Sequence, residues 1–371
     1  MTSTIRPFTE ADIPEVADLH RRVFHVRPES SPALLAAYRG WLVEVFLDPA
    51  RREPGIDSLV LEDAAGAIHG FLGAVPRRVR IHGESSLAAV STQLVVDESH
   101  RSQLAGVRLL RAFLSGPQDL SIADEAGDGA RRLWEAMGGE TAHLLSLGWT
   151  RPLAPCVWLA THLASRRSLG TLARAARPLA RAADGLLARW PRNPLRAPAP
   201  EIQAEEASPE ALAEQLPALV GRSLHVEPDP ASLRWSLARA AEVLRIQPEI
   251  VILRGALGAP VGAYVHAPRA GAADETLLLA AAPPTMADTV AHLLHRAAER
   301  GATAVSGRLD RRMLPALAPS RTLFHRGKWF LVHARRPGLT AAFERGDALF
   351  SRLDGEMSLR FDPGEEEPHR E

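Results

Sequence analysis

The sequence predicts an α/β (α+β) protein in which one mixed-sheet domain is followed by a second domain of similar element order. The chain has 371 residues, of which 46% are hydrophobic and 24% charged, and a single core rarely grows beyond about 250–300 residues. Strand-like and helix-like segments alternate through residues 1–150, and a similar order returns in residues 201–337 without a residue-level repeat. We therefore expect a first domain in residues 1–156, an Arg-rich helical linker in residues 157–200, and a second domain with a tail in residues 201–371.

The first half predicts a short strand, two helices, an antiparallel hairpin with its neighbour, and then a strand–helix–strand–helix–strand run. Apolar residues recur at helical spacing from Ile13, and Asp48-Pro49 ends the second helix. A turn at residues 63–66 divides the hairpin, and Gly138-Gly139 ends the last helix. The expected elements are strand 4–8, helix 13–23, helix 34–47, strand 57–61, hairpin 58–81, strand 87–96, helix 102–114, strand 120–123, helix 128–137 and a strand from residue 141.

The second half begins again with two helices and then follows nearly the same order. Its expected elements are helices 209–220 and 231–244, strands 250–253, 261–266 and 276–280, helix 287–300, strand 303–306, helix 310–317 and strand 328–334. Between the halves, residues 157–198 carry eight arginines against one acid, Asp184, with leucines at roughly helical spacing. Residues 191–200 are rich in proline and predict a connecting segment.

Composition argues against several functional classes. The formal net charge of +0 gives no global attraction to nucleic acid. One cysteine, Cys156, provides neither a disulfide framework nor a cysteine-based zinc site, and His292 and His295 lack a third ligand at a known metal-binding spacing. The N-terminus has no apolar signal-peptide region, and no apolar run reaches about 18 residues. We expect a cytoplasmic protein without a metal.

The most informative stretch is residues 94–110, which predict a strand, a polar turn that holds Arg101, and a helix. The first turn of a helix has unsatisfied backbone N–H groups and the positive end of the helix dipole, so it binds phosphate. Small residues at Ala105 and Gly106 allow a pyrophosphate to approach closely, and Ser102 adds a hydroxyl donor. This turn therefore predicts an anion-binding site.

This stretch resembles the pyrophosphate-binding signature of the GNAT acetyltransferase superfamily, Val-x-x-x-x-(Arg/Gln)-x-x-Gly-x-(Gly/Ala). Val96, Arg101 and Gly106 match it, whereas Leu104 stands where the first glycine belongs and Glu98 stands where proline is common. The resemblance covers residues 3–150 well, because segments 5–14 and 133–138 also look like the family's opening and its Leu-Tyr-x-x-x-Gly motif. It covers residues 201–337 as an order of elements.

The resemblance implies a CoA thioester bound between the fourth and fifth strands of the first domain. Backbone N–H groups of the fourth strand would hold the pantetheine and polarise the thioester carbonyl, and the turn would hold the pyrophosphate. The co-substrate is expected to be acetyl-CoA or another acyl-CoA. The residues assigned to it are Leu94, Val95, Val96, Arg101, Ser102, Gln103, Ala105 and Gly106.

A general base must take a proton from the acceptor. Glu98 and Asp124 lie at the ends of the two strands and are the candidate catalytic residues; His100 is a third, and for each a solvated surface role stays open. The family often uses a tyrosine as general acid where this chain has Trp134. An indole N–H cannot donate a proton at useful pH, so either a water serves or the first domain does not catalyse.

The second half offers no comparable turn, since residues 280–288 contain two prolines and neither arginine nor glycine. We expect a degenerate copy that packs on the first domain or shapes an acceptor groove. The function expected is acyl-CoA-dependent transfer to an amine or hydroxyl of a small molecule or sugar; the alternative is a non-catalytic module that senses acyl-CoA or binds a partner. Residues 157–198 leave two roles open, a weak membrane-surface contact and a solvated helix between domains, and oligomerisation is also left open.

Overall fold

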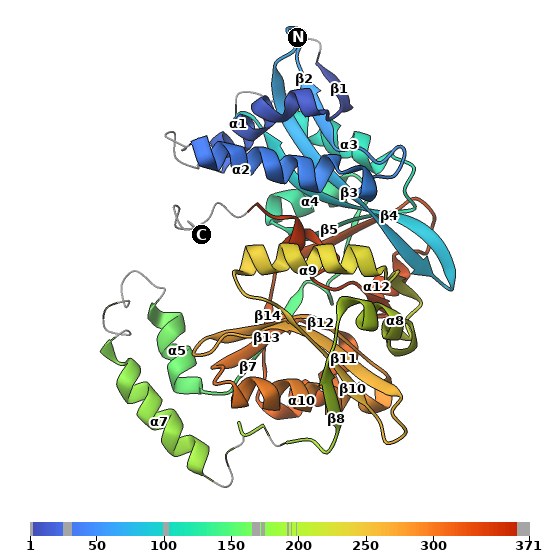
Figure 1. Cartoon of the computed structure of the whole chain (residues 1–371). Coiled ribbons are helices and arrows are strands. Elements are labelled where there is room, and N and C mark those ends of the chain that lie inside the picture. The colour runs from blue at the N-terminus through green and yellow to red at the C-terminus, as the bar shows by residue number, and fades with distance from the viewer. Residues whose placement is uncertain are drawn as a thin grey trace.

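The computed structural model describes residues 3–24, 32–98, 104–164, 171, 175–190, 193, 195–197 and 199–361. Two mixed β-sheets, each covered by helices, lie one above the other in Figure 1. This confirms the expected mixed α/β class, and the two sheets fit a tandem arrangement.

The first sheet forms the upper layer in Figure 1 and is antiparallel apart from the β4–β5 and β9–β16 pairs. Its strand order is β1 (Thr4–Pro7), β2 (Leu59–Glu62), β3 (Ile68–Ile81), β4 (Glu84–Val96), β5 (Leu120–Ala126), β15 (Trp329–Ala334) and β6 (Glu140–Thr141), with β9 (Leu224–Val226) and β16 (Ala348–Leu349) attached beyond β3. Helices α1 (Ile13–Val23) and α2 (Pro32–Leu42) share one core cluster. Helices α3 (Ala105–Leu114) and α4 (Asp128–Ala136) share another, so the two pairs cover opposite faces.

The second sheet repeats this plan. Its order is β14 (Leu323–Arg326), β7 (Leu147–Pro152), β13 (Ala304–Arg308), β12 (Ala273–Ala281), β11 (Pro260–Ala267), β10 (Glu249–Arg254) and β8 (Gln203–Glu206). Helices α8 (Pro209–Val220) and α9 (Pro230–Leu244) pack in one cluster. Helices α10 (Met286–Glu299) and α11 (Leu314–Leu317) pack in the other, and α12 (Ala341–Glu344) precedes β16.

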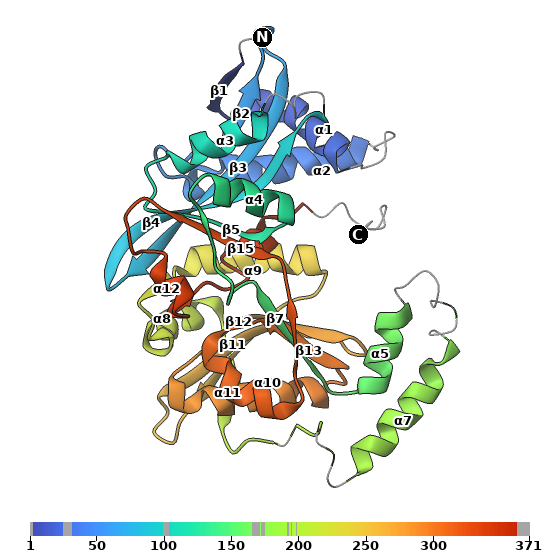
Figure 2. The same cartoon turned by 180° about the vertical axis from the view of Figure 1, so that it is seen from behind.

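The two sheets exchange their penultimate strands. β7 precedes the linker in sequence, yet it lies between β13 and β14 of the second sheet. β15 comes from the second half and lies between β5 and β6 of the first sheet, as Figure 2 shows from behind. The division between the sheets therefore does not coincide with any single position in the chain, and the predicted domain boundaries stay a prediction.

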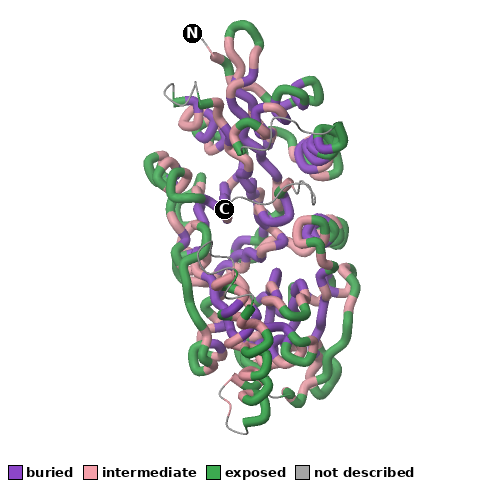
Figure 3. Tube along the Cα trace, turned by 90° about the vertical axis from the view of Figure 1, so that its left-hand side faces the viewer, coloured by how far each residue is buried: buried purple, intermediate pink, exposed green. Residues whose placement is uncertain are grey.

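Most predicted elements of the first half form, with shifted ends. The helix expected over residues 34–47 ends as α2 at Leu42 and continues as a π-helical turn over Val43–Leu47. The strand expected from residue 141 is instead two strands, β6 and β7. Buried residues line the sheets (Figure 3), whereas α5 (Pro155–Ala164) and α7 (Arg177–Arg189) lie to one side. Within the described residues, no helix has both the length and the apolar character needed to cross a membrane.

Candidate active site

The first sheet opens between β4 and β5. The two strands pair in parallel at Ala88, Ala89 and Val90, but β4 then runs on to Val96 without pairing with β5. A bulge bends β4 just beyond the last pair: Gln93 has a φ of 53°, and the register with β3 shifts between Phe71 and Gly73. A bulge re-aims a strand and ends its pairing, so the strands diverge into a splay.

The backbone of β4 faces this splay. The Asp97 N–H donates to the His69 carbonyl of β3 at 2.9 Å. Because backbone groups alternate in direction along a strand, the N–H groups of Leu94 and Val96 point away from β3, towards the splay, while Val95 is turned towards β3. The first two donors have the direction that the predicted pantetheine contacts require.

The predicted anion-binding turn leads into α3. Leu104 precedes the helix in the left-handed conformation, with φ 57° and ψ 26°, and its side chain is 63% exposed. That conformation favours glycine, which is the residue that the signature has at this position. Ala105 is buried, and a Cβ added at Gly106 would meet Val96 Cγ2 at 3.8 Å. His100, Arg101, Ser102 and Gln103 lie outside the described residues.

Asp124, one of the two predicted catalytic carboxylates, lies in the centre of the molecule. It is 1% exposed. Its Oδ2 accepts a hydrogen bond from Arg308 Nη2 of β13 at 2.6 Å, and its Oδ1 accepts one from the Glu356 backbone N–H at 2.6 Å. Glu98, in contrast, is exposed and follows the end of β4. Asp124 therefore holds the two sheets together and has both oxygens engaged.

A third carboxyl group, Glu356, reaches the splay from the C-terminal strap, which we define as residues 350–361. Its Oε1 accepts hydrogen bonds from the backbone N–H groups of Asp124 and Glu125 at 3.0 and 3.1 Å, and Thr92 of β4 lies beside it. Burial, and then the nearby Asp124 charge, raise the pKa of Glu356 to about 8. The sequence reasoning missed this residue, because 232 positions separate it from Asp124 and no local motif marks it.

The strap approaches the splay from the α1/α2 face. Trp41 Nε1 of α2 donates to the Leu359 carbonyl at 3.0 Å, and the Phe361 ring stacks on Tyr38 at 3.8 Å between centroids. Leu359 and Phe361 both pack in the α1/α2 cluster. The helix that follows the anion-binding turn, α3, lies on the opposite face, so the strap and the predicted CoA site occupy different sides of the sheet.

Trp134, at the position where the family often has tyrosine, is part of the core. It is 2% exposed and packs near Phe113 of α3, with ring centroids 6.4 Å apart. A Cβ added at Gly139 would meet its ring at 3.2 Å. Its role in this position is packing.

The second sheet opens in a corresponding place. β12 and β13 pair in parallel from Ala273 to Thr276, and β12 then continues to Ala281 with an extra residue, Leu277, at a register shift. The strap crosses this splay as well, since the Arg352 N–H donates to the Leu277 carbonyl at 3.0 Å. The following turn is a 3₁₀ segment, Pro283–Thr285, that begins with two prolines.

A cavity of about 60 Å³ lies between the first sheet, α8, α9 and the strap. Arg77 of β3 and Asp354 of the strap line it, and the Arg77 Nε donates to the Asp354 carbonyl at 3.0 Å. Burial lowers the pKa of the Arg77 guanidinium and raises the pKa of the Asp354 carboxyl. The lining includes Ser232 and Ser236 of α9, so both halves of the chain shape this cavity. In the described part of the chain, no three His, Cys, Asp or Glu side chains are grouped to hold a metal ion.

Comparison with known proteins agrees with this geometry. Residues 4–118 match the acetyltransferase (GNAT) domain family, whereas no curated protein matches the sequence. Similar folds occur in a probable N-acyltransferase from Enterococcus faecalis V583 (TM-score 0.57, 12% identity, covering 90% of this chain and 72% of that one) and in a GCN5-related N-acetyltransferase from Kribbella flavida (0.55, 13%, 89% and 70%). A GCN5-related N-acetyltransferase from Anabaena variabilis ATCC 29413 is also similar (0.56, 11%, 91% and 74%). Residues 4–118 therefore match the GNAT acetyltransferase domain family, and the chain as a whole is similar in fold to GCN5-related N-acetyltransferases.

Proposed function

We propose that this protein transfers an acyl group from acetyl-CoA, or another short acyl-CoA, to an amine or hydroxyl of a small molecule or sugar. The observation that supports this most directly is the splay between β4 and β5, with its bulge at Gln93 and two backbone donors directed into it. The match of residues 4–118 to the acetyltransferase (GNAT) domain family also supports acyl-CoA-dependent transfer. A cytoplasmic location and an oligomeric state stay predictions of the sequence.

The acyl-CoA enters from the α3 face in this proposal. The pyrophosphate binds the turn from Arg101 to Gly106, where the first turn of α3 provides unpaired N–H groups. The thioester carbonyl lies near the N–H groups of Leu94 and Val96, which stabilise the negative charge that develops on its oxygen. The acceptor nitrogen or oxygen attacks the carbonyl carbon, the C–S bond breaks, and the CoA thiolate leaves and takes a proton from water.

Glu356 is the group that we assign to take the acceptor's proton, directly or through one water. It is buried at the point where the strands diverge, and a pKa raised to about 8 makes it a stronger base than an exposed carboxylate. Asp124 is engaged by Arg308, and Glu98 lies on the surface beyond β4. The two carboxylates proposed from the sequence therefore rank behind Glu356.

The α1/α2 face is the acceptor side. The strap covers it, and the cavity with Arg77 and Asp354 adjoins the strap two residues before Glu356. Helices α8 and α9 of the second half form one wall of this cavity. We thus assign the second half a part in shaping the acceptor site, as a degenerate copy that does not itself bind CoA.

A second candidate function is a non-catalytic acyl-CoA sensor. The observation that favours it is the closed acceptor face, where Glu356 and Phe361 of the strap occupy the splay and the surface of Tyr38. A protein of this kind would bind acyl-CoA through the same turn but release no CoA.

Thermal unfolding with acetyl-CoA tests the binding step. A ligand that binds the folded state raises the free energy of unfolding by RT ln(1 + [L]/Kd), about 2.7 kcal/mol at 100 times Kd. We expect a rise in Tm that Arg101→Glu abolishes. Pro284→Glu, which also places a carboxylate in an exposed turn, here in the second half, is the control and keeps the rise. No rise with acetyl-CoA, other short acyl-CoAs or free CoA would contradict both functions.

Release of CoA in the presence of amine and sugar acceptors tests the chemistry. Glu356→Gln should keep the thermal shift and lower kcat by about 10²–10⁴-fold, the typical contribution of a general base. Glu98→Gln, which changes an exposed carboxylate near the same strand, should leave kcat within about twofold. Binding without CoA release by the unaltered protein supports the sensor instead.

A further inference from the structure

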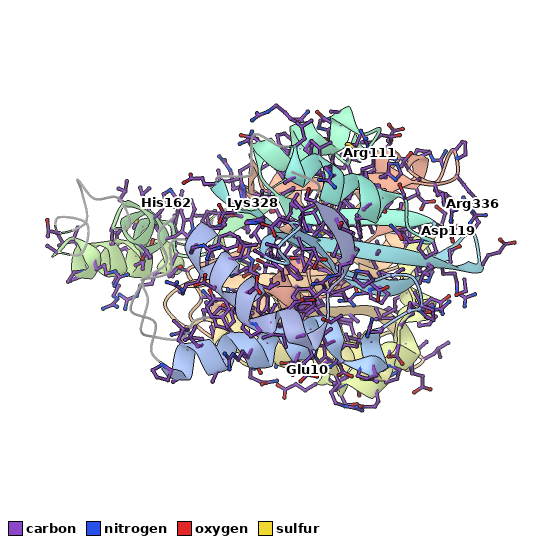
Figure 4. All side chains as sticks on the ribbon, turned by 90° about the horizontal axis from the view of Figure 1, so that it is seen from above. Glu10, Arg111, Asp119, His162, Lys328 and Arg336 are labelled. Carbon is purple, nitrogen blue, oxygen red and sulfur yellow. The ribbon has the colours of Figure 1, made fainter. Side chains whose placement is uncertain are left out.

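The helical hairpin of α5 and α7 stands apart from both sheets. Figures 1 and 2 show it beside the second sheet, and Figure 4 shows His162 of α5 far from the centre of the molecule. The buried residues of α5 are Val157 and Ala160, and α7 has none. The hairpin therefore contributes little to either core.

Side-chain hydrogen bonds join the two helices of the hairpin to each other. Asp184 of α7 accepts hydrogen bonds from the Cys156 and Val157 N–H groups at 3.0 and 2.8 Å, at the start of α5. Arg177 Nη2 donates to Thr161 Oγ1 at 3.3 Å. Unpaired N–H groups at a helix start are favourable partners for a carboxylate. The one acid of the segment is thus used to hold the two helices together.

The outer face of the hairpin is apolar. Leu179 and Leu186 are 76% and 69% exposed, and Trp190, just after the helix, is 52% exposed. Seven residues make almost two helical turns, and 11 residues make about three. The three side chains therefore lie along one stripe of α7, on a side that does not face α5. Leu159 of α5 is also 50% exposed.

The segment that contains the hairpin is strongly basic. Residues 157–198 carry eight arginines and one aspartate, a formal charge of +7, so the remainder of a chain with a net charge of +0 carries −7. Arg189 is exposed on α7 next to the apolar stripe, and Arg181 is exposed on the opposite side of the helix. Apolar side chains flanked by arginines are typical of helices that lie in the interface of an anionic bilayer, where the arginine stems extend to the headgroups.

We propose that the α5–α7 hairpin docks the protein on the surface of a bilayer that contains anionic phospholipids. Leu179, Leu186 and Trp190 insert between the headgroups, and the arginines contact the phosphates. A symmetric contact between two copies of this segment, residues 157–198, would bring +7 against +7, which does not favour self-association through this face. This docking is independent of the acyl transfer proposed above.

Vesicle flotation of the full-length chain tests the proposal. The chain should float with vesicles of phosphatidylcholine and phosphatidylglycerol at 7:3 and not with vesicles of phosphatidylcholine alone. Binding should fall at least tenfold in 0.5 M NaCl, because salt screens charges at the surface. The double variant Leu179→Gln/Leu186→Gln should bind at least tenfold less, and Arg181→Gln/Arg189→Gln should bind several-fold less.

Leu257→Gln is the matched control, because this leucine is 98% exposed in the turn between β10 and β11. It should float like the unaltered chain. Far-ultraviolet circular dichroism and Tm check that each variant is folded, which is expected because the changed side chains are exposed. Absence of flotation, equal flotation with neutral vesicles, or a dimer in light scattering that the Leu179→Gln/Leu186→Gln variant loses would each overturn the proposal.

Discussion

The splay of the first sheet leads into the turn that we predict to bind an anion, whereas the corresponding splay of the second sheet leads into Pro283-Pro284. Both strands at these openings carry an extra residue, near Gln93 in β4 and at Leu277 in β12. Both pair with their parallel neighbour for a few residues and then diverge. A proline has no N–H to offer a phosphate. The comparison shows that two sheets can share the same diverging strands while the turn after the second opening begins with two prolines, which offer no backbone N–H group.

The strap contacts both openings, and at the first it places a buried carboxyl group. At β12 its Arg352 bonds through the backbone to Leu277 and pairs with Glu275. At β5 its Glu356 donates its N–H to Asp124 and accepts backbone hydrogen bonds through its side chain. A backbone contact continues the sheet, whereas a buried carboxyl at the first opening has a cost of desolvation and an altered pKa. We therefore interpret the contact with β12 as structural. The Glu356 carboxyl group at the first opening has the burial and the raised pKa of a candidate functional group.

The largest effects on stability are expected from changes in the two exchanged strands, β7 and β15, because each belongs to the sheet built mainly from the other half of the chain. Trp149 of β7 and Phe330 of β15 are both fully buried, the first in the core of the second sheet and the second in the core of the first. Each change to alanine should lower the free energy of unfolding by about 3–5 kcal/mol, measured in urea. Hydrogen exchange should rise first in β11–β13 for Trp149→Ala and first in β3–β5 for Phe330→Ala.

The informative outcome is that each variant loosens the sheet built mainly from the other half of the chain. Leu257→Ala, at a fully solvated position, should change neither stability nor exchange by a measurable amount. If Trp149→Ala instead loosens β3–β5 first, the assignment of β7 to the second core is wrong.

The pH dependence of stability separates the two contacts of the strap. The pKa of Glu356 is raised from 4.5 to about 8 in the folded protein, so the folded state holds a proton that the unfolded state has lost. This stabilising contribution is complete below pH 4.5 and is lost as pH rises through 8. Relative to Glu356→Gln, the stability of the unaltered chain should fall by about 1.4 kcal/mol per pH unit between pH 5 and 8.

Glu275→Gln provides the control for the second opening. Glu275 of β12 is partly exposed and pairs with Arg352 Nε at 2.9 Å, so its variant should follow the unaltered chain over the same pH range. Urea unfolding at three or more pH values measures both. A difference between the unaltered chain and Glu356→Gln that stays constant with pH would show that Glu356 is ionised in the folded state.

The order of elements in the first half could be predicted because the signals are local, and the anion-binding role of the turn before α3 stays a prediction. Helical spacing from Ile13 and the strand–turn–helix pattern around residues 94–110 depend on neighbours in the chain. The exchange of β7 and β15 could not be predicted, since a buried strand carries no mark of which sheet it joins. Glu356 was missed for the same reason: its partners in β5 are set by the path of the strap, not by residues next to it.

The smallest expected change in stability is at Leu104, which lies in the turn that follows the first opening. It adopts a φ of 57° with a mostly exposed side chain, and a left-handed conformation costs a non-glycine residue about 1–2 kcal/mol. Glycine removes this cost but loses more entropy on folding, so Leu104→Gly should stabilise the chain by about 0.5 kcal/mol. Arg245, which follows α9 with a φ of 53°, offers the matched change in the second half, and Arg245→Gly should stabilise the chain by the same amount.

Titration with acetyl-CoA then distinguishes the two variants. Leu104→Gly should tighten acetyl-CoA binding several-fold because the turn can approach the pyrophosphate, whereas Arg245→Gly should leave the Kd unchanged. Equal effects on the Kd would mean that stability, and not the shape of the turn, controls binding at the first opening.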